Sequence, residues 1–237
     1  MIFPGKAGFP GQRMDAAAFH ALVGRATVIE RDGFGEKVLQ TPEGLMVKIF
    51  RRKRLLTSAA LFPYARRFIR NARLLAERGI PTVSVAGYAY CPALGRHVVT
   101  YHPLPGRTLR SCLQSEGRDP DRLLAAVAVF MAALHRQGVY FRSLHFGNII
   151  VTPEMTFGLI DMADMTIGSK PLDIGRRARN FRHLVRYRED TAHLQGFGCA
   201  RFLEEYLESA GLAPRSRRAF LGQVGKTPVW SEPAAVP

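Results

Sequence analysis

Two oxygen-bearing side chains, Asn148 and Asp161, have the chemistry and the spacing of a metal-binding pair. Asn148 precedes the apolar run Ile149–Val151, and Asp161 follows a second apolar run at residues 158–160. The two runs predict a hairpin that turns around residues 153–156 and brings both polar residues to one end. Carboxylate and amide oxygens are ligands that suit Mg²⁺. Either residue alone would fit a turn or a helix cap, but both in this order after a long helix favour a metal site.

Lys48 is the candidate for contact with the phosphates of a nucleotide. Phosphoryl transfer moves a highly charged group, so its catalysis depends mostly on positioning and on nearby cations. Lys48 lies in the strand-like segment GLMVKIF at residues 44–50, where Val47 and Ile49 face the opposite side. The competing interpretation is a surface lysine at the end of a strand.

Gly33 and Gly35 stand between the first two predicted strands, where a glycine-containing loop would cover those phosphates. A hairpin turn that contains glycine needs no ligand to explain it. Both interpretations of this turn stay open on the sequence.

The order of predicted elements indicates an α+β fold in two lobes. A small antiparallel sheet with one long helix is followed by a mainly helical part, with the segment PLPG at 103–106 as the hinge. Strands are expected at 26–30, 37–40, 45–50, 82–90 and 96–101, and helices at 57–78, 108–115 and 121–137. We expect an N-terminal arm and a short helix capped by Asp15 over 1–23, a first lobe over 24–102, a second over 103–211, and a final helix with a loose tail over 212–237.

Six segments together resemble the lipopolysaccharide-core kinase superfamily, most closely the toluene-tolerance or lipopolysaccharide-kinase-like proteins. They are GLMVKIFRRKR at 44–54, RGIPT at 78–82, YHPLPG at 101–106, LHRQG at 134–138, FRSLHFGN at 141–148 and LID at 159–161. The resemblance extends from about residue 24 to about residue 208. It implies a bilobal protein-kinase-like fold, ATP and Mg²⁺ as cofactors, and Lys48, Asn148 and Asp161 in the roles given above.

The loop FRSLHFGN departs from the kinase pattern at the position of the catalytic Asp, which is Ser143 here. A hydroxyl is a poor proton acceptor near neutral pH, so a general-base contribution of about 10²–10⁴-fold would be largely missing. His145 titrates in a useful range and is a candidate base or substrate contact. Its alternative is a structural histidine that binds the loop backbone. The predicted helix at 57–78 also offers no clear Glu partner for Lys48, since only Glu77 stands near its end.

A basic segment at residues 173–188 follows the predicted metal site. Arg176, Arg179 and Arg182 recur there at helical spacing. They are either a solvated helix face or, with Arg142 of the loop, a docking surface for a phosphorylated saccharide or an anionic membrane leaflet, because guanidinium groups suit phosphate.

Charge and composition restrict the classes of partner. The net charge is +15, with 34 Lys and Arg against 19 acidic residues, which predicts attraction to polyanions. Nucleic acid ranks last because no helix-turn-helix, zinc-finger or aromatic RNA-binding pattern accompanies the charge. The three cysteines have no metal-ligand spacing, and the N-terminus lacks the apolar core of a secretory signal. We therefore expect a cytoplasmic protein with peripheral contact at the inner membrane face.

The sequence favours an ATP- and magnesium-dependent phosphotransferase acting on an alcohol group of an anionic glycolipid or phosphorylated saccharide. In this hypothesis Ser143, His145 and Asp161 are catalytic, Asn148 and Asp161 bind metal, and Lys48, Gly33 and Gly35 bind nucleotide. The alternative is a non-catalytic pseudokinase that binds nucleotide or an envelope component. A Ser/Thr protein kinase is the weaker third hypothesis.

Overall fold

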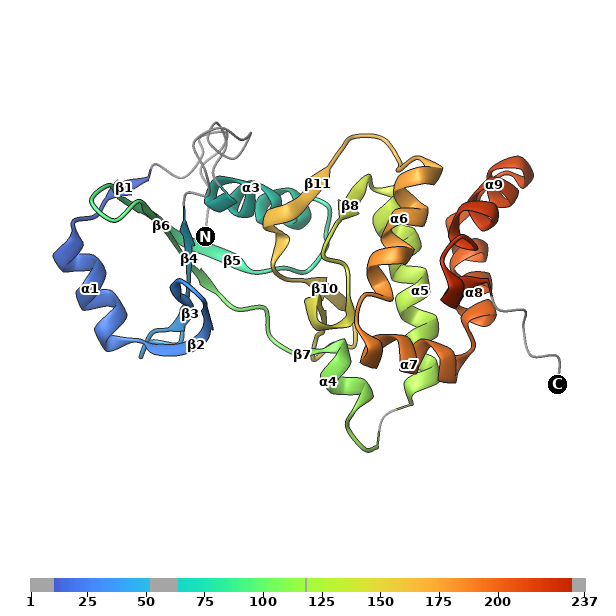
Figure 1. The fold of residues 1–237 in the computed structure, drawn as a ribbon, viewed down its shortest axis with the longest axis horizontal. Helices are drawn as coiled ribbons and strands as arrows, with labels where there is room; N and C mark the ends of the chain where they lie inside the picture. The colour runs from blue at the N-terminus through green and yellow to red at the C-terminus, as the bar shows by residue number, and fades with distance from the viewer. Residues whose placement is uncertain (1–10, 52–63, 118, 232–237) are drawn as a thin grey trace. The chain divides into compact units, whose positions relative to one another are not determined.

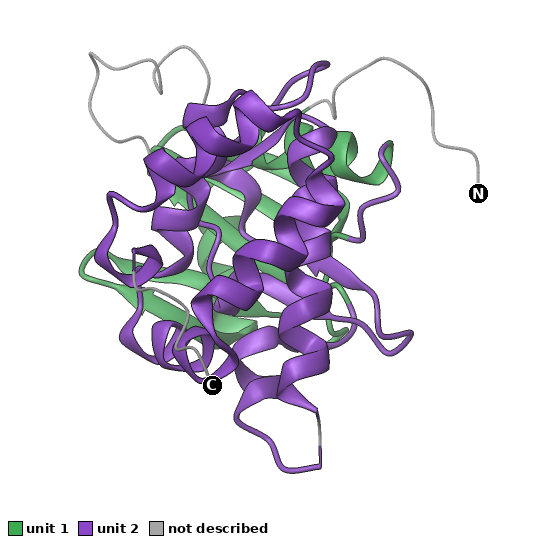
Figure 2. Ribbon diagram, turned by 90° about the vertical axis from the view of Figure 1, so that its right-hand side faces the viewer, with its two compact units in different colours: residues 1–77, 82–104 green, residues 78–81, 105–237 purple. Residues whose placement is uncertain are grey.

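A computed structural model describes residues 11–51, 64–117 and 119–231. The chain divides into two compact units, shown as ribbons in Figure 1 and by colour in Figure 2. Unit 1 takes in the chain up to residue 77 together with 82–104, and unit 2 takes in 78–81 and the chain from residue 105 onward. The first unit is rich in sheet and the second is mainly helical, which confirms the predicted α+β class.

Unit 1 is built on a six-stranded sheet with the strand order β1-β5-β6-β4-β3-β2. Its elements are β1 (Gln12–Arg13), α1 (Ala16–Arg25), β2 (Thr27–Asp32), β3 (Gly35–Gln40), β4 (Met46–Arg51), α3 (Tyr64–Ala76), β5 (Ser84–Cys91) and β6 (Arg96–His102). All neighbours are antiparallel except β1, which runs parallel to β5. The expected arm is therefore wrong at Gln12 and Arg13, which form a strand instead. Residues 1–10 and the predicted start of the long helix at 57–63 lie outside the described residues.

The two faces of β4 serve different purposes, as the sequence predicts. Val47 and Ile49 belong to a buried apolar cluster with Phe19 of α1. Asp15 caps that helix, because its side chain accepts a hydrogen bond of 2.7 Å from the Ala18 amide. The opposite face of the sheet carries Lys48 and lies against α3.

Unit 2 contains the hairpins that carry the predicted site. Its strands are β7 (Arg107–Thr108), β8 (Val139–Phe141), β9 (Ile149–Val151), β10 (Phe157–Leu159) and β11 (Met165–Ile167). They form a three-stranded sheet, β10-β9-β7, and a two-stranded one, β11-β8. The 3₁₀ turns η1 (Phe146–Asn148) and η2 (Met162–Asp164) connect the two sheets. The loop at residues 142–148 thus leaves one small sheet at β8 and enters the other at β9.

Helices make up the rest of unit 2. They are α4 (Leu109–Leu113), α5 (Pro120–Arg136), α6 (Ile174–Leu184), α7 (Arg188–Phe197), α8 (Cys199–Ala210) and α9 (Pro214–Val224), followed by the turn η3 (Pro228–Trp230). Helix α5 packs on α8, and α6 packs on α9. In Figure 1, α5 and α6 lie next to each other, to the right of β8 and β10.

An aromatic cluster closes the core between the last helices. The ring of Phe181 meets the rings of Tyr206, Phe220 and Trp230 edge-on, with centroids 4.8, 5.2 and 5.2 Å away. The Trp230 indole donates a hydrogen bond of 3.1 Å to the Phe181 carbonyl. The expectation of a loose tail is therefore wrong at Trp230, which is buried. Residues 232–237 lie outside the described residues.

Candidate active site

The hairpin of β9 and β10 places Asn148 and Asp161 at the same end, as predicted. Leu159 pairs with Ile149 in the antiparallel ladder. One step further, the Ile160 amide donates a hydrogen bond of 3.1 Å to the Asn148 carbonyl. Asp161 is the next residue, so both candidate metal ligands lie at the end of the hairpin where the paired strands stop.

Asn148 is fixed by two hydrogen bonds within its own loop. Its Nδ2 donates to the Ser143 carbonyl at 2.9 Å, and its backbone amide donates to the His145 carbonyl at 2.9 Å. The side chain is buried. Because the amide nitrogen is used inside the loop, Oδ1 is the atom that would bind a cation.

Asp161 has a left-handed backbone, with φ of +55° and ψ of 43°. This conformation costs an ordinary residue roughly 1–2 kcal/mol, and Asp is among the residues that tolerate it best. It turns the chain sharply from β10 into η2. A non-glycine residue held in this region next to Asn148 is the kind of local strain that clusters at functional sites.

The donor set fits Mg²⁺ with few protein ligands. Within the described ranges, no group of three or more His, Cys, Asp and Glu side chains is placed to hold a metal. Mg²⁺ commonly binds through one or two carboxylates together with water and substrate phosphates. One amide oxygen and one carboxylate from the same end of a hairpin match that pattern.

Ser143 is paired with a carboxylate that the sequence did not indicate. Its Oγ donates a hydrogen bond of 2.5 Å to Asp164 Oδ2. Burial is the main cause that raises the pKa of Asp164, and the charge of Asp161 adds to it. The hydrogen bond from Ser143 and the charge of Arg142 oppose this in part. The residue that replaces the usual base is thus in contact with an acidic group of raised proton affinity.

His145 binds the loop backbone through one ring nitrogen. Its Nδ1 accepts a hydrogen bond of 3.2 Å from the Gly147 amide. Its ring packs edge-on against Tyr187, with centroids 4.7 Å apart. Burial, ahead of all charges nearby, lowers its pKa. The structural interpretation of His145 thus accounts for Nδ1.

A buried carboxylate, that of Asp190 on α7, binds the backbone of the loop. Its Oδ1 accepts from Arg110 Nε at 2.8 Å, and its Oδ2 accepts from Arg110 Nη2 and from the Phe146 amide, both at 3.0 Å. Arg110 also pairs with Glu189 at 2.8 Å and lies over the Tyr187 ring. The bidentate pair anchors the start of η1, two residues before Asn148. Nothing in the spacing of the sequence indicates this contact.

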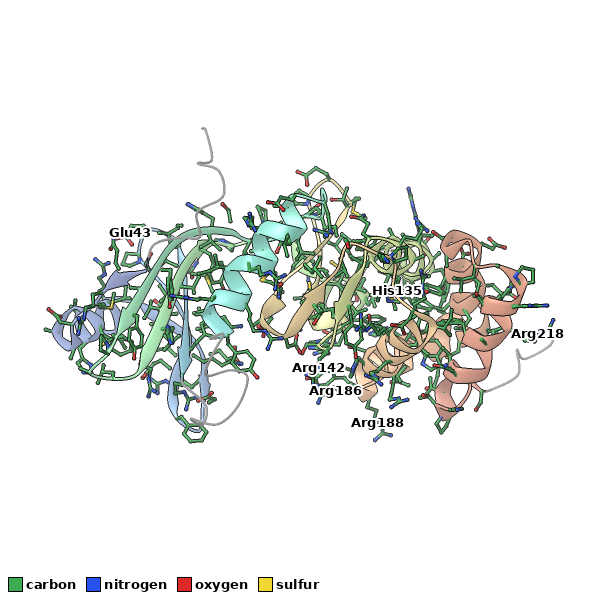
Figure 3. All side chains as sticks on the ribbon, turned by 90° about the horizontal axis from the view of Figure 1, so that it is seen from above. Glu43, His135, Arg142, Arg186, Arg188 and Arg218 are labelled. Carbon is green, nitrogen blue, oxygen red and sulfur yellow. The ribbon has the colours of Figure 1, made fainter. Side chains whose placement is uncertain are left out.

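A second buried network supports the end of β8. Arg177 donates to the Tyr206 hydroxyl at 3.0 Å, and Tyr206 lies 2.8 Å from His135 Nδ1. His135 Nε2 donates to Asn180 Oδ1 at 3.1 Å, and Asn180 Nδ2 donates to the Phe141 carbonyl at 2.6 Å. Burial, with a smaller contribution from the charge of Arg177, lowers the pKa of His135 to about 3. Neutral His135, labelled in Figure 3, therefore donates to Asn180, which in turn binds the strand that leads into the loop.

In unit 1, Lys48 occupies the middle of β4 and is only 6% exposed. Its ammonium lies 5.9 Å from the ring centroids of both Phe50 and Phe68. The interpretation as a surface lysine at a strand end is therefore wrong. Asn71, one turn after Phe68 on α3, is also buried. Glu77 instead forms an i,i+4 ion pair of 3.4 Å with Arg73.

Gly33 lies in the tight turn between β2 and β3 and Gly35 is the first residue of β3, at the position expected for a phosphate-covering loop. Gly35 has φ of +114°, a conformation that favours glycine. Between them Phe34 is 76% exposed, and the Arg51 guanidinium lies 4.3 Å from its ring centroid. Arg51 also binds Asp32, which caps the turn by accepting from the Phe34 amide at 3.0 Å. The structure thus ties this turn to the end of β4.

Arginine side chains gather beside the catalytic loop in unit 2. The pKa of His183 is lowered first by burial and then by Arg186, Arg142, Arg182 and Arg179, which places these four cations around it. All four are exposed, and Figure 3 shows the labelled Arg142 and Arg186 on the same side of the unit. In the part of the chain that the structure describes, none of the four pairs with an acidic side chain. Arg176, in contrast, pairs with Asp173 at 3.4 Å.

Comparison with known proteins gives a match in the same region. Residues 37–144 match APH, the phosphotransferase enzyme family, over slightly less than half of the chain. The matched stretch begins in β3, contains Lys48 and ends directly after Ser143. The fold is kinase-like. The match supports a kinase-like phosphotransferase in general and does not single out lipopolysaccharide-core kinases.

No curated protein matches the chain. Among the described residues, none of the kinase-like chain's helices has the length and apolar content needed to cross a bilayer.

Proposed function

We propose that the chain is an ATP- and magnesium-dependent phosphotransferase with an alcohol group as acceptor. The observation that carries this proposal is the joint placement of Asn148 and Asp161 at one hairpin end, within a kinase-like fold. When bound, Mg²⁺ would neutralise charge on the nucleotide phosphates. Asn148 Oδ1 and the Asp161 carboxylate are the groups that would hold it.

The nucleotide phosphates would be held from unit 1. Lys48 supplies a buried ammonium, which is a strong point charge for phosphate in a site of low polarity. Gly33 and Gly35 carry no side chains, so the backbone at these two positions can approach a phosphate closely. Ser143 and His145 would face the acceptor hydroxyl.

The acceptor in this proposal is an anionic glycolipid or phosphorylated saccharide, such as a sugar of the lipopolysaccharide core. Arg142 of the loop and Arg179 and Arg182 of α6 are exposed cations that lie near one another. Arg176 lies in the first turn of α6. Guanidinium groups bind phosphate in a bidentate manner, so this surface suits an acceptor that already carries a phosphate. The same surface would give peripheral contact with an anionic leaflet.

Thermal unfolding in the presence of Mg-ATP tests the nucleotide site. We expect stabilisation of the wild type that disappears in Asp161→Asn. Asp121→Asn is the matched control, because it makes the same charge change at an exposed ion pair with Arg201. An absence of Mg-ATP stabilisation in the wild type would contradict the proposed function.

Transfer of the γ-phosphoryl group from ATP to purified lipopolysaccharide-core saccharide tests the reaction. We expect transfer by the wild type and by Asp121→Asn, and none by Asp161→Asn. Ser143 in place of the usual Asp favours a second candidate, a pseudokinase that binds nucleotide without turnover. Stabilisation by Mg-ATP with no transfer to any acceptor, water included, would favour that candidate.

A further inference from the structure

The pairing of Ser143 with Asp164 gives the loop an acidic group where the sequence shows none. The distance of 2.5 Å between Ser143 Oγ and Asp164 Oδ2 lies in the range of a charge-assisted hydrogen bond from a hydroxyl to a carboxylate. The two residues come from different segments, the loop after β8 and the turn η2. Their contact therefore depends on the fold and not on local sequence.

The side chain of Asp164 is in contact with the Ser143 hydroxyl through one of its two oxygens, and its other oxygen is buried. Its Oδ1 has no accessible surface and accepts no hydrogen bond from another residue within the described ranges. Its Oδ2 is the oxygen that meets the Ser143 hydroxyl. A buried carboxylate oxygen without a partner costs roughly 1–3 kcal/mol or more, so its presence calls for a functional reason.

Ser143 itself is held on both sides. Its carbonyl accepts from Asn148 Nδ2 at 2.9 Å, and its hydroxyl donates to Asp164. One residue is thus fixed to a candidate metal ligand through its backbone and to a buried carboxylate through its side chain. Since Ser143 stands where kinases carry the base, this arrangement places a two-residue proton acceptor at that position.

We propose that Ser143 and Asp164 act together as the proton acceptor of phosphoryl transfer, an inference that rests on the proposed function. The acceptor's hydroxyl oxygen bonds to the γ-phosphorus as the bond from that phosphorus to the β-bridging oxygen breaks, and ADP leaves with the electron pair. The hydroxyl proton moves to Ser143 Oγ while the hydrogen of Ser143 moves to Asp164 Oδ2. Asp164 later returns its proton to water through Ser143. Ser143 touches the acceptor, and Asp164 is a positioning residue that acts through it.

Asp164→Asn is the decisive variant, because it keeps the size and an accepting oxygen but cannot take up a proton. Hydrolysis of Mg-ATP, with water as the acceptor, gives kcat and KM without a known substrate. We expect kcat to fall by about 10²–10⁴-fold, with an unchanged KM for ATP and unchanged Mg-ATP stabilisation. A role in loop structure alone predicts wild-type kcat in this variant, and that result would overturn the proposal.

A double variant separates a shared role from two independent ones. Ser143→Ala should lower kcat about as much as Asp164→Asn, and combining the two should cost no more than either alone, because residues that act as a unit are not additive. Multiplied losses in the double variant would overturn the relay.

Exchanging the two residues provides a gain-of-function arm. Ser143→Asp alone sets two carboxylates in contact, whereas Ser143→Asp with Asp164→Ser leaves one carboxylate at the loop position. We expect the exchange variant to match or exceed wild-type kcat and to exceed Ser143→Asp alone. An inactive exchange variant that still binds Mg-ATP would contradict the relay and leave the nucleotide site intact.

A wild type that binds Mg-ATP but turns over neither water nor core saccharide would also overturn the relay. A wild type that does not bind Mg-ATP would remove the proposed function as well.

Discussion

The turn between β2 and β3 in unit 1 and the loop at residues 142–148 in unit 2 are both expected to handle phosphate, yet they are held in opposite ways. The turn is fastened at the surface, where Lys37 pairs with Glu30 at 2.5 Å and Arg51 binds Asp32. The loop is fastened from inside: Asp190 binds the Phe146 amide, and Asn180 binds the carbonyl of Phe141 directly before the loop. Both side chains are fully buried. The difference indicates that the fold fixes the position of the loop closely and leaves the turn to adapt.

Energetics give this comparison a scale. Exposed ion pairs contribute about 0–1 kcal/mol to stability, because water and salt screen them. Removing one partner of a buried pair costs about 3–5 kcal/mol, because the other charge is left without compensation. Substitutions behind the loop should therefore destabilise the protein several times more than substitutions beside the turn.

The largest effect is expected for Asp190→Ala. This change removes three hydrogen bonds at once and leaves Arg110 and the Phe146 amide without their buried acceptor. We expect the free energy of unfolding to fall by about 3–5 kcal/mol in urea denaturation. Glu189→Gln is the control, because Glu189 binds the same arginine from an exposed position and should change stability by less than about 1 kcal/mol. Equal losses in the two variants would contradict the comparison.

The cost of replacing a glycine by alanine should also differ between the two units, as Gly138 before β8 and Gly35 at the turn illustrate. Gly138 has φ of +74°, and an added Cβ would lie 2.5 Å from the Lys170 carbonyl oxygen and 2.7 Å from that of Gly168. Gly35 has φ of +114° with no atom within 4 Å of such a Cβ. We expect Gly138→Ala to destabilise by about 3 kcal/mol or more and Gly35→Ala by about 1–2 kcal/mol, since the latter involves strain without overlap. The urea midpoints of the two variants would measure both losses, provided that the dependence of the free energy of unfolding on urea concentration is unchanged. A larger loss in Gly35→Ala than in Gly138→Ala would be evidence against a tightly packed start of β8.

A pH effect should come from His135 behind the loop. Its folded pKa is lowered from 6.5 to about 3, so below pH 6.5 the unfolded chain binds a proton that the folded chain does not. This contribution to stability is complete above pH 6.5 and is lost as the pH falls toward 3, by about 2 kcal/mol at pH 5. Urea unfolding at pH 7 and pH 5 should show this loss of free energy of unfolding in the wild type and a smaller loss in His135→Gln. An equal loss in that variant would assign the pH effect to other groups.

The smallest effect is expected for Glu30→Gln at the turn. Its pair with Lys37 is exposed on both sides, so removing it should change the free energy of unfolding by less than about 1 kcal/mol. The difference should shrink further in high salt. A loss comparable to that of Asp190→Ala would show that the turn is as firmly fixed as the loop.

Local patterns in the sequence were sufficient for much of the fold. The apolar runs around Asn148 and Asp161 predicted the hairpin of β9 and β10, and alternation in β4 predicted that Val47 and Ile49 face away from Lys48. These predictions succeed because strand periodicity and turn residues act over a few positions. The two residues of β1 were missed because their only signal is a pairing with β5, far along the chain.

The supports of the loop could not be predicted for the same reason. Ser143 and Asp164 are 21 positions apart, the Phe146 amide and Asp190 are 44 apart, and Asn180 and the Phe141 carbonyl are 39 apart. A carboxylate or an amide in a helix looks like a surface residue until the helix is packed. The candidate metal- and nucleotide-binding residues were therefore visible in the sequence, whereas the residues that position them required the tertiary structure.

The hydrogen bonds behind β8 all point the same way. Arg177 donates to Tyr206, Tyr206 to His135, His135 to Asn180, and Asn180 to the carbonyl of Phe141. Such a chain has a polarity, and each link sets the tautomer or amide orientation of the next. Removing the hydroxyl at its head, as in Tyr206→Phe, takes away the donor that holds the proton of His135 on Nε2. A chemical change on α8 is thereby transmitted through the orientation of protons to Phe141, the residue before the loop at residues 142–148.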